Sequence, residues 1–201
     1  VKAVPDVAIL SLGIEAQEAS VAKAQAEAAT AMDKVMAALK SGGVADKDIQ
    51  TQSFNIQRVT RWDDDKQQEI TIGYRVTNTV TAKIRTIGKV GSVIDTVVSA
   101  GGDFTRINNI GVTVDDLKPY QEQARQLAVS DAAAKAKKLA DTAGVKLGKP
   151  TYISESSYVP GPIYRTDMMA KAEAAPAPVE TPISPGEIEI TTNVQIAYDI
   201  E

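Results

Sequence analysis

The longest alternation of apolar and polar positions in the chain extends from Ile70 to Ile84. Even-numbered positions in this run are apolar or small, with Asn78 the one exception, whereas the odd-numbered ones are Thr, Gly, Arg or Lys. Because side chains alternate between two faces and each residue rises about 3.3 Å, the run predicts a strand of roughly 50 Å with one polar, solvent-exposed (wet) face. A strand of this length needs partner strands along it.

Shorter alternating runs predict further strands. In one of them, at 49–59, we place Phe54 and Ile56 on the buried face, and the following Asp63-Asp64-Asp65 predicts a turn. A calcium site is the alternative for this triplet, but no glycine-punctuated loop or bidentate glutamate follows at the required offset. The other predicted strands lie at 7–14, 104–114, 152–158 and 188–200.

Apolar residues at spacings of three and four predict three helices. The first begins after Ser20 and ends at the glycine pair 42–43, and a short one over 88–100 ends at the glycine pair 101–102. The longest has Pro119 in its first turn and Gly144 at its C-terminal cap.

The order strand, long helix, strand, strand occurs twice along the chain. It predicts an α+β fold with two βαββ-like halves, at about 4–86 and 103–201, in which two long helices and one short helix cover long antiparallel strands. Six of the 9 prolines fall within 160–186, which predicts a long loop between paired strands.

Composition narrows the range of functions. Cysteine and histidine are both absent, so thiol and imidazole chemistry cannot be built, and we expect no enzyme and no cofactor. The balance of 22 Lys and Arg against 26 Asp and Glu gives a net charge of −4, which argues against a nucleic-acid partner. No run approaches the roughly 18 apolar residues of a membrane-spanning helix.

Two charged or aromatic positions on the long strand are candidates for assembly or partner contacts. Tyr74 falls on the apolar face, where a core position is favoured over a ligand contact. Arg75 falls on the wet face and forms, with Lys83 and Arg85, a charged row that is typical of an edge strand guarded against unwanted pairing.

The remaining candidates lie on the longest helix and in the proline-rich loop. Arg125 pairs with Glu122 or Gln121 on its own helix, which we favour, or reaches another subunit. Met168 and Met169 predict a partner contact or a plain loop rather than a soft copper site, because no histidine or third methionine is nearby. Tyr164 of the same loop completes this set of candidate contacts.

The chain contains several short motifs: IQTQSFNI at 49–56, IGYRVTN at 72–78, KVGSVID at 89–95, EQARQLAVSDA at 122–132 and AGVKLGK at 143–149. In combination they resemble motifs of the SIMPL-domain family of bacterial envelope proteins. The resemblance covers nearly all of 1–201, as one SIMPL-like domain. It implies an exported periplasmic or outer-membrane-associated protein, made with a signal peptide, that self-associates to high order. It also implies links with oxidative-stress tolerance and antibody recognition, and it carries no catalytic residues.

The leading hypothesis is therefore a non-enzymatic envelope protein whose open strand edges join copies of the chain into a closed homo-oligomer. Envelope proteins or the outer membrane are further candidate partners. One alternative is a binding module that captures an extended peptide or an unfolded envelope protein through an edge strand or the 160–186 loop. Another is an enzyme that uses carboxylates such as Asp103 or Glu155.

Overall fold

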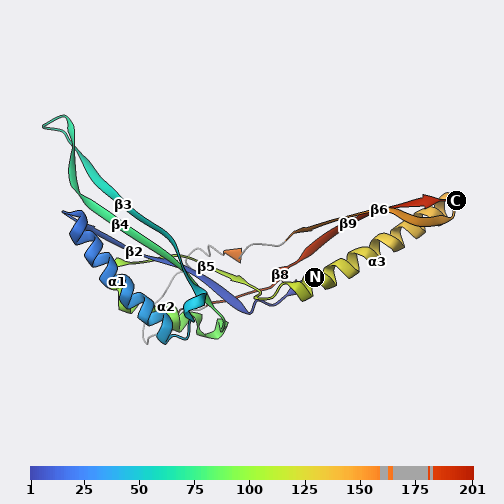
Figure 1. The fold of residues 1–201 in the computed structure, drawn as a ribbon, viewed down its shortest axis with the longest axis horizontal. Coiled ribbons are helices and arrows are strands. Elements are labelled where there is room, and N and C mark those ends of the chain that lie inside the picture. The colour runs from blue at the N-terminus through green and yellow to red at the C-terminus, as the bar shows by residue number, and fades with distance from the viewer. Residues whose placement is uncertain (159–162, 165–180, 182) are drawn as a thin grey trace, which may run out of the picture. The chain divides into compact units, whose positions relative to one another are not determined.

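The structure, a computed structural model, describes residues 1–158, 163–164, 181 and 183–201. They form two compact units, which are drawn in Figure 1 and described separately here. The five-stranded unit comprises residues 6–113 and the described part of 164–185. The long-helix unit comprises 1–5, the described part of 114–163, and 186–201.

A five-stranded sheet with the order β3-β4-β2-β5-β7 forms the first unit. Its long strands pair antiparallel with their neighbours. The bounds are β2 (Val7–Glu18), β3 (Ile49–Asp63), β4 (Gln68–Ile84), β5 (Thr105–Thr113) and β7 (Ile163–Tyr164). The long alternating run is thus confirmed as a strand, and it lies inside the sheet between β3 and β2.

The register of β2 against β4 places both apolar rows on one face. Leu10 lies opposite Ala82 and Leu12 opposite Val80, and all four are buried. Asn78, the exception in the alternation, also lies on this face, and its Oδ1 is buried without a hydrogen-bond partner in the described structure. The odd-numbered residues of the two strands form the opposite, more polar face.

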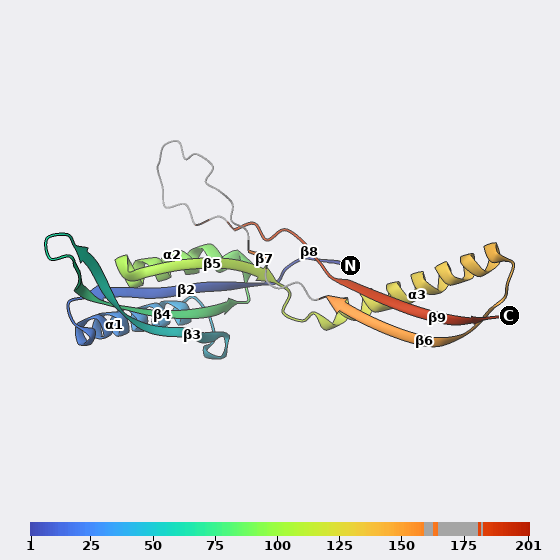
Figure 2. The same ribbon diagram turned by 90° about the horizontal axis from the view of Figure 1, so that it is seen from above.

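Two helices cover the apolar face, α1 (Val21–Ser41) and α2 (Val90–Gly101), as Figures 1 and 2 show. Ser20 caps α1, because its hydroxyl oxygen accepts a hydrogen bond from the Lys23 backbone N–H. The alanines Ala24, Ala28 and Ala31 are buried, so α1 can lie close to the sheet. Three short 3₁₀ turns flank these elements: η1 (Asp46–Asp48), η2 (Ile87–Lys89) and η3 (Gly102–Phe104).

In its described residues, the long-helix unit packs one helix beside two antiparallel ribbons. One ribbon pairs β6 with β9, and a shorter one pairs β1 with β8. Gly144 ends the helix in a left-handed conformation, with φ 73°, as the sequence predicts. The bounds are β1 (Lys2–Ala3), α3 (Lys118–Ala143), β6 (Leu147–Tyr158), β8 (Ile188–Glu189) and β9 (Thr191–Ile200).

The α+β fold is confirmed, with long antiparallel strands and two long helices and one short one among the described residues. The chain order βαββ also occurs twice, but β5 pairs with β2 rather than with β6 or β9. Val112 and Val114, on one face of the predicted strand at 104–114, contribute to different cores. The single-domain interpretation, with halves at about 4–86 and 103–201, stays a prediction.

Two expectations about strand environments are wrong. Phe54 and Ile56 are 53% and 38% exposed, because β3 lies at the sheet edge, beyond the helix layer. The row of Arg75, Lys83 and Arg85 does not guard an edge, since β4 is paired on both sides.

Gly73 marks the point where β2 ends beside β4, and it allows a close approach of their backbones. A Cβ atom at this position would lie 2.8 Å from the carbonyl oxygen of Glu18. We therefore expect Gly73→Ala to lower the free energy of unfolding by about 1–3 kcal/mol through overpacking. Chemical denaturation measures this, with Gly88→Ala as the control, because nothing lies within 4 Å of a Cβ there. Equal stability of the two variants would contradict the prediction.

Candidate functional site

The outer edge of β3 is the longest unpaired strand edge among the described residues of the five-stranded unit. β3 has 15 residues and pairs only with β4 in the described structure. Its backbone N–H and C=O groups on the other side are available to a further strand. An edge of this kind binds another extended chain by main-chain hydrogen bonds.

The central part of this edge, residues 53–59, is the part best suited to strand pairing. Register shifts interrupt β3 between Thr51 and Ser53 and between Val59 and Thr60, whereas the residues from Ser53 to Val59 keep one register against β4. The segment contains no Pro, Gly or Lys. At about 3.3 Å per residue it offers roughly 23 Å of continuous strand.

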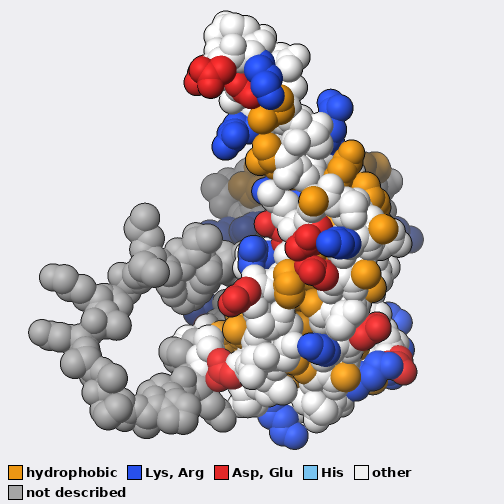
Figure 3. Space-filling view, turned by 90° about the vertical axis from the view of Figure 1, so that its left-hand side faces the viewer, with side chains coloured by type: hydrophobic (Ala, Val, Ile, Leu, Met, Phe, Trp, Pro, Cys, Tyr) orange, Lys and Arg blue, Asp and Glu red, His pale blue; other side chains and the backbone are white. Residues whose placement is uncertain are grey.

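Past the end of β2, the strands β3 and β4 continue as a two-stranded arm. The last pair between β2 and β4 joins Glu18 and Tyr74, so residues 59–72 extend past β2. Trp62 on the arm is 53% exposed. Figure 3 shows charged side chains at the tip of the arm and hydrophobic ones below them.

The predicted turn at the tip of the arm is confirmed. Asp63 Oδ1 accepts hydrogen bonds from the backbone N–H groups of Asp65 and Lys66, both at 3.1 Å. This is the local side-chain bonding that stabilises Asp-containing turns.

Tyr74 and Arg75 lie where β2 ends. Tyr74 is half-buried on the helix-facing side, outside the main core cluster. Arg75 lies on the opposite face, where its Nη2 donates to Gln17 Oε1 at 3.0 Å and its Nε is 3.8 Å from Glu15 Oε1. One hydrogen bond and one ion pair therefore hold Arg75 against β2 within its own chain.

Arg85, at the other end of β4, makes a bidentate ion pair. Its Nε and Nη2 donate to the two carboxylate oxygens of Asp48 at 2.8 and 2.9 Å. Hydrogen bonding to Arg85 lowers the pKa of Asp48. The pair ties the end of β4 to the turn that precedes β3 and so positions the start of the edge strand.

Arg125 forms the main charged cluster of the long-helix unit. The predicted pair with Glu122 on the same helix is present. Arg125 also donates from Nε and Nη2 to the carboxylate of Glu155 on β6, at 2.7 and 3.1 Å. Sequence reasoning missed this bidentate contact, because 30 residues separate the partners and no local spacing signals it.

Hydrogen bonds to the Arg125 guanidinium lower the pKa of Glu155, and the Ser157 hydroxyl, which donates to Glu155 Oε1 at 2.7 Å, lowers it further. The pKa of Arg125 is raised, mainly by the hydrogen bonds to Glu155. Glu155 is therefore ionised at neutral pH, which suits an ion pair rather than a general acid.

The other predicted contact residues fall in or near the proline-rich loop. Tyr164 belongs to β7, whereas Met168 and Met169 lie outside the described residues. Residues 1–158, 163–164, 181 and 183–201 bring no three Asp, Glu, His or Cys side chains together as a metal site. None of the helices within these ranges is long and apolar enough to span a membrane.

Comparisons with known proteins extend along the whole chain. The model of the SIMPL family, described as a protein of unknown function (DUF541), matches residues 1–198. The 26 kDa periplasmic immunogenic protein of Brucella melitensis is 37% identical over 98% of this chain and 80% of its own length. The uncharacterized protein YggE of Escherichia coli K12 is 32% identical over 100% of this chain and 80% of its own length.

The fold and these comparisons define a class: the chain belongs to the SIMPL family. The Brucella melitensis relative and a second one, from Brucella abortus at 36% identity, are named as periplasmic and immunogenic. None of these relatives is named as an enzyme.

The Arg125–Glu155 pair generates a pH prediction. A lowered pKa in the folded state means that the pair contributes stability above the ordinary carboxyl pKa of about 4.3 and loses it as the pH falls below that value. In Arg125→Gln we expect the pKa of Glu155 to rise toward its ordinary value, and NMR titration of its side-chain carboxyl carbon measures this.

Lys135→Gln is the matched control, because it removes an exposed ion pair with Asp131 from the same helix. The pKa of Glu155 should then stay low. An unchanged pKa in Arg125→Gln would show that Arg125 does not stabilise the carboxylate.

Proposed function

We propose that this chain is a non-enzymatic protein of the bacterial periplasm, associated with the cell envelope, that assembles into a high-order homo-oligomer. The observation that carries the proposal is the open edge of β3, with its unbroken register over residues 53–59. The Brucella relatives are named as periplasmic immunogenic proteins, which supports the periplasmic location and the immunogenic character.

An unpaired edge that also exposes apolar side chains is costly for a monomer. Phe54, Ile56 and Trp62 on β3 are all exposed. Such an edge invites uncontrolled association unless it is covered. Pairing with another copy in a closed arrangement covers the edge and stops growth at a defined size.

The family resemblance adds a link with oxidative-stress tolerance, which we include as an effect of the envelope assembly. The chain has four methionines and no cysteine. Reversible thiol oxidation is therefore unavailable, and methionine oxidation alone is a weak means of removing oxidants.

The same edge supports a second candidate, a binding module that captures an extended peptide or an unfolded envelope protein. Main-chain hydrogen bonding by an edge strand does not itself distinguish a second copy from a foreign strand. A chain that stays monomeric at high concentration and binds an extended peptide through β3 would favour this candidate over self-assembly.

The assembly is tested by Phe54→Lys. A lysine replaces an exposed phenylalanine on the edge strand, so the monomer should fold, whereas a strand interface would have to desolvate the new charge. We expect light scattering over a concentration series to give a large, discrete mass for the unaltered chain and a mass near 21.3 kDa for the variant.

Gln25→Lys, at an exposed position of α1, is the control for added charge and should assemble normally. A mass of 21.3 kDa for the unaltered chain at every concentration would contradict the assembly. Full assembly of Phe54→Lys would contradict the role of the β3 edge.

Localisation is tested by fractionating bacteria that produce the protein from its natural gene. We expect the protein in the periplasmic fraction released by osmotic shock, with a further portion in washed outer membranes. A cytoplasmic marker enzyme serves as the control. Recovery of the protein with that marker would contradict the proposed location.

A further inference from the structure

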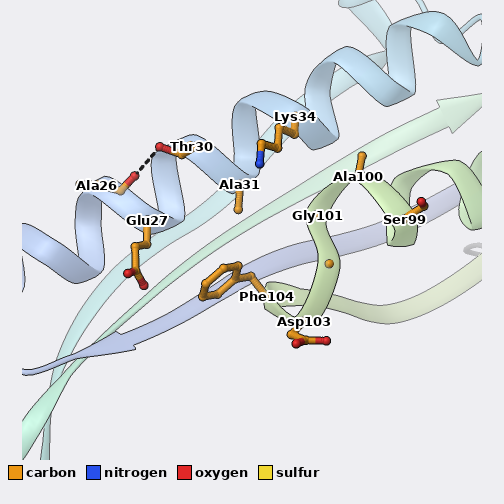
Figure 4. A pocket seen from close by; sticks show the side chains of 11 residues that line it. Ala26, Glu27, Thr30, Ala31, Lys34, Ser99, Ala100, Gly101, Asp103 and Phe104 are labelled. Carbon is orange, nitrogen blue, oxygen red and sulfur yellow. Dashed lines mark hydrogen bonds between the residues drawn. The ribbon is translucent and has the colours of Figure 1, made fainter.

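A cleft in the helix layer of the five-stranded unit has no role in the proposed assembly. Its volume is about 600 Å³, within the range of about 300–1,000 Å³ that is typical of small-molecule sites. One face of α1 and the segment from Ser99 to Phe104, where α2 ends, line it (Figure 4).

Small residues create this hollow. The α1 wall includes Ala26 and Ala31, and the facing wall includes Gly101 and Gly102. Gly102 has φ 56°, a left-handed conformation that glycine adopts without strain, and its backbone N–H donates to the Val98 carbonyl oxygen. Helix α2 therefore ends at the cleft, and the backbone changes direction at Gly102.

One end of the cleft favours a positive charge. The carboxylates of Glu27 and Asp103 lie on different sides of the Phe104 ring (Figure 4). Neither carboxylate has an ion pair or side-chain hydrogen bond with another described residue. The C-terminal end of α2 adds the negative end of its helix dipole. The Phe104 ring is half-buried against the core, and an aromatic face attracts organic cations.

The other end of the cleft favours a negative charge. Lys34 lies seven residues after Glu27 on α1, which places it on the same side of the helix about 10 Å further along the axis. In Figure 4 its side chain points back along α1 toward Ala31, away from Ala100 and Ser99, and it has no ion-pair partner among the described residues. The small apolar walls lie between the two charged ends.

We propose that this cleft binds a small zwitterion with an apolar spacer, of the class of ω-amino acids and short peptides. The ammonium group lies at Phe104 between Glu27 and Asp103, and the carboxylate pairs with Lys34. The site belongs to the helix layer, so the proposal stands apart from the edge pairing of β3.

Three probes of matched length test the two ends: 6-aminohexanoate, hexylamine and hexanoate. We expect 6-aminohexanoate to bind most tightly, hexylamine more weakly and hexanoate not at all in isothermal titration. Backbone amide shifts in NMR spectra should change at residues 99–104 and along the cleft side of α1. Absence of 6-aminohexanoate binding into the millimolar range, or equal binding of hexanoate, would overturn the proposal.

Variants assign the roles of the charges. Glu27→Gln and Asp103→Asn should each weaken binding of both amines about tenfold, the scale expected for a lost charge-assisted hydrogen bond. Lys34→Gln should weaken 6-aminohexanoate binding alone and leave hexylamine binding unchanged. Asp33→Asn, an exposed neighbour on α1 outside the cleft lining, is the control and should bind like the unaltered chain. Unchanged affinities in all three cleft variants would overturn the proposed site.

Discussion

The antiparallel pairing of β2 with β4 is the constraint on which the five-stranded unit depends. Its register runs from Ala8 opposite Ile84 to Glu18 opposite Tyr74 and aligns the apolar rows of both strands on one face. Fully burying one such aliphatic side chain contributes about 1.5–3 kcal/mol. A shift of register by one residue would turn one row to the opposite face, so the helix layer and the sheet order depend on this single alignment.

The exposed features of the unit follow from that alignment. β5 occupies the second edge of β2, so β3 can pair only with the outer side of β4 and becomes the edge strand. Because β4 is longer than β2, the β3–β4 ribbon continues past Glu18 as the arm. The edge for a further strand and the cleft for a small molecule therefore lie in different layers, and a substitution in one need not disturb the other.

Local chemistry explains what could be predicted from the sequence. The alternation at 70–84, the helix start after Ser20, the turn at Asp63 and the glycine at position 144 each depend on a few neighbouring residues, and all are confirmed. Alternation also assigns Phe54 and Ile56 to one face correctly, but it cannot indicate whether a helix covers that face. Strand order depends on contacts between residues far apart in the chain, so the charged row alone indicates an edge at β4, whereas the edge strand is β3. The same limit applies to Arg125. Its pair with Glu122 is predictable because the two residues are one helical turn apart, whereas its pair with Glu155 is not, because Glu155 is on another element.

The long-helix unit gives a physical reason why association would stabilise the chain. Only Ala124 and Ala140 of α3 are buried, and the main core of the unit lies near the start of the helix, around Val114 and Ile190. Further along, Leu139 and Ile153 are 71% and 63% exposed. A two-stranded ribbon with one small-residue helix buries little apolar surface, and such ribbons are marginally stable alone. Contacts that cover these side chains would bury apolar surface in the part of the long-helix unit that has the smallest core. The five-stranded unit, in contrast, already has an extensive core. In an assembly joined by the β3 edge, the long-helix unit would therefore gain the most stability from any neighbouring copy that packs against it.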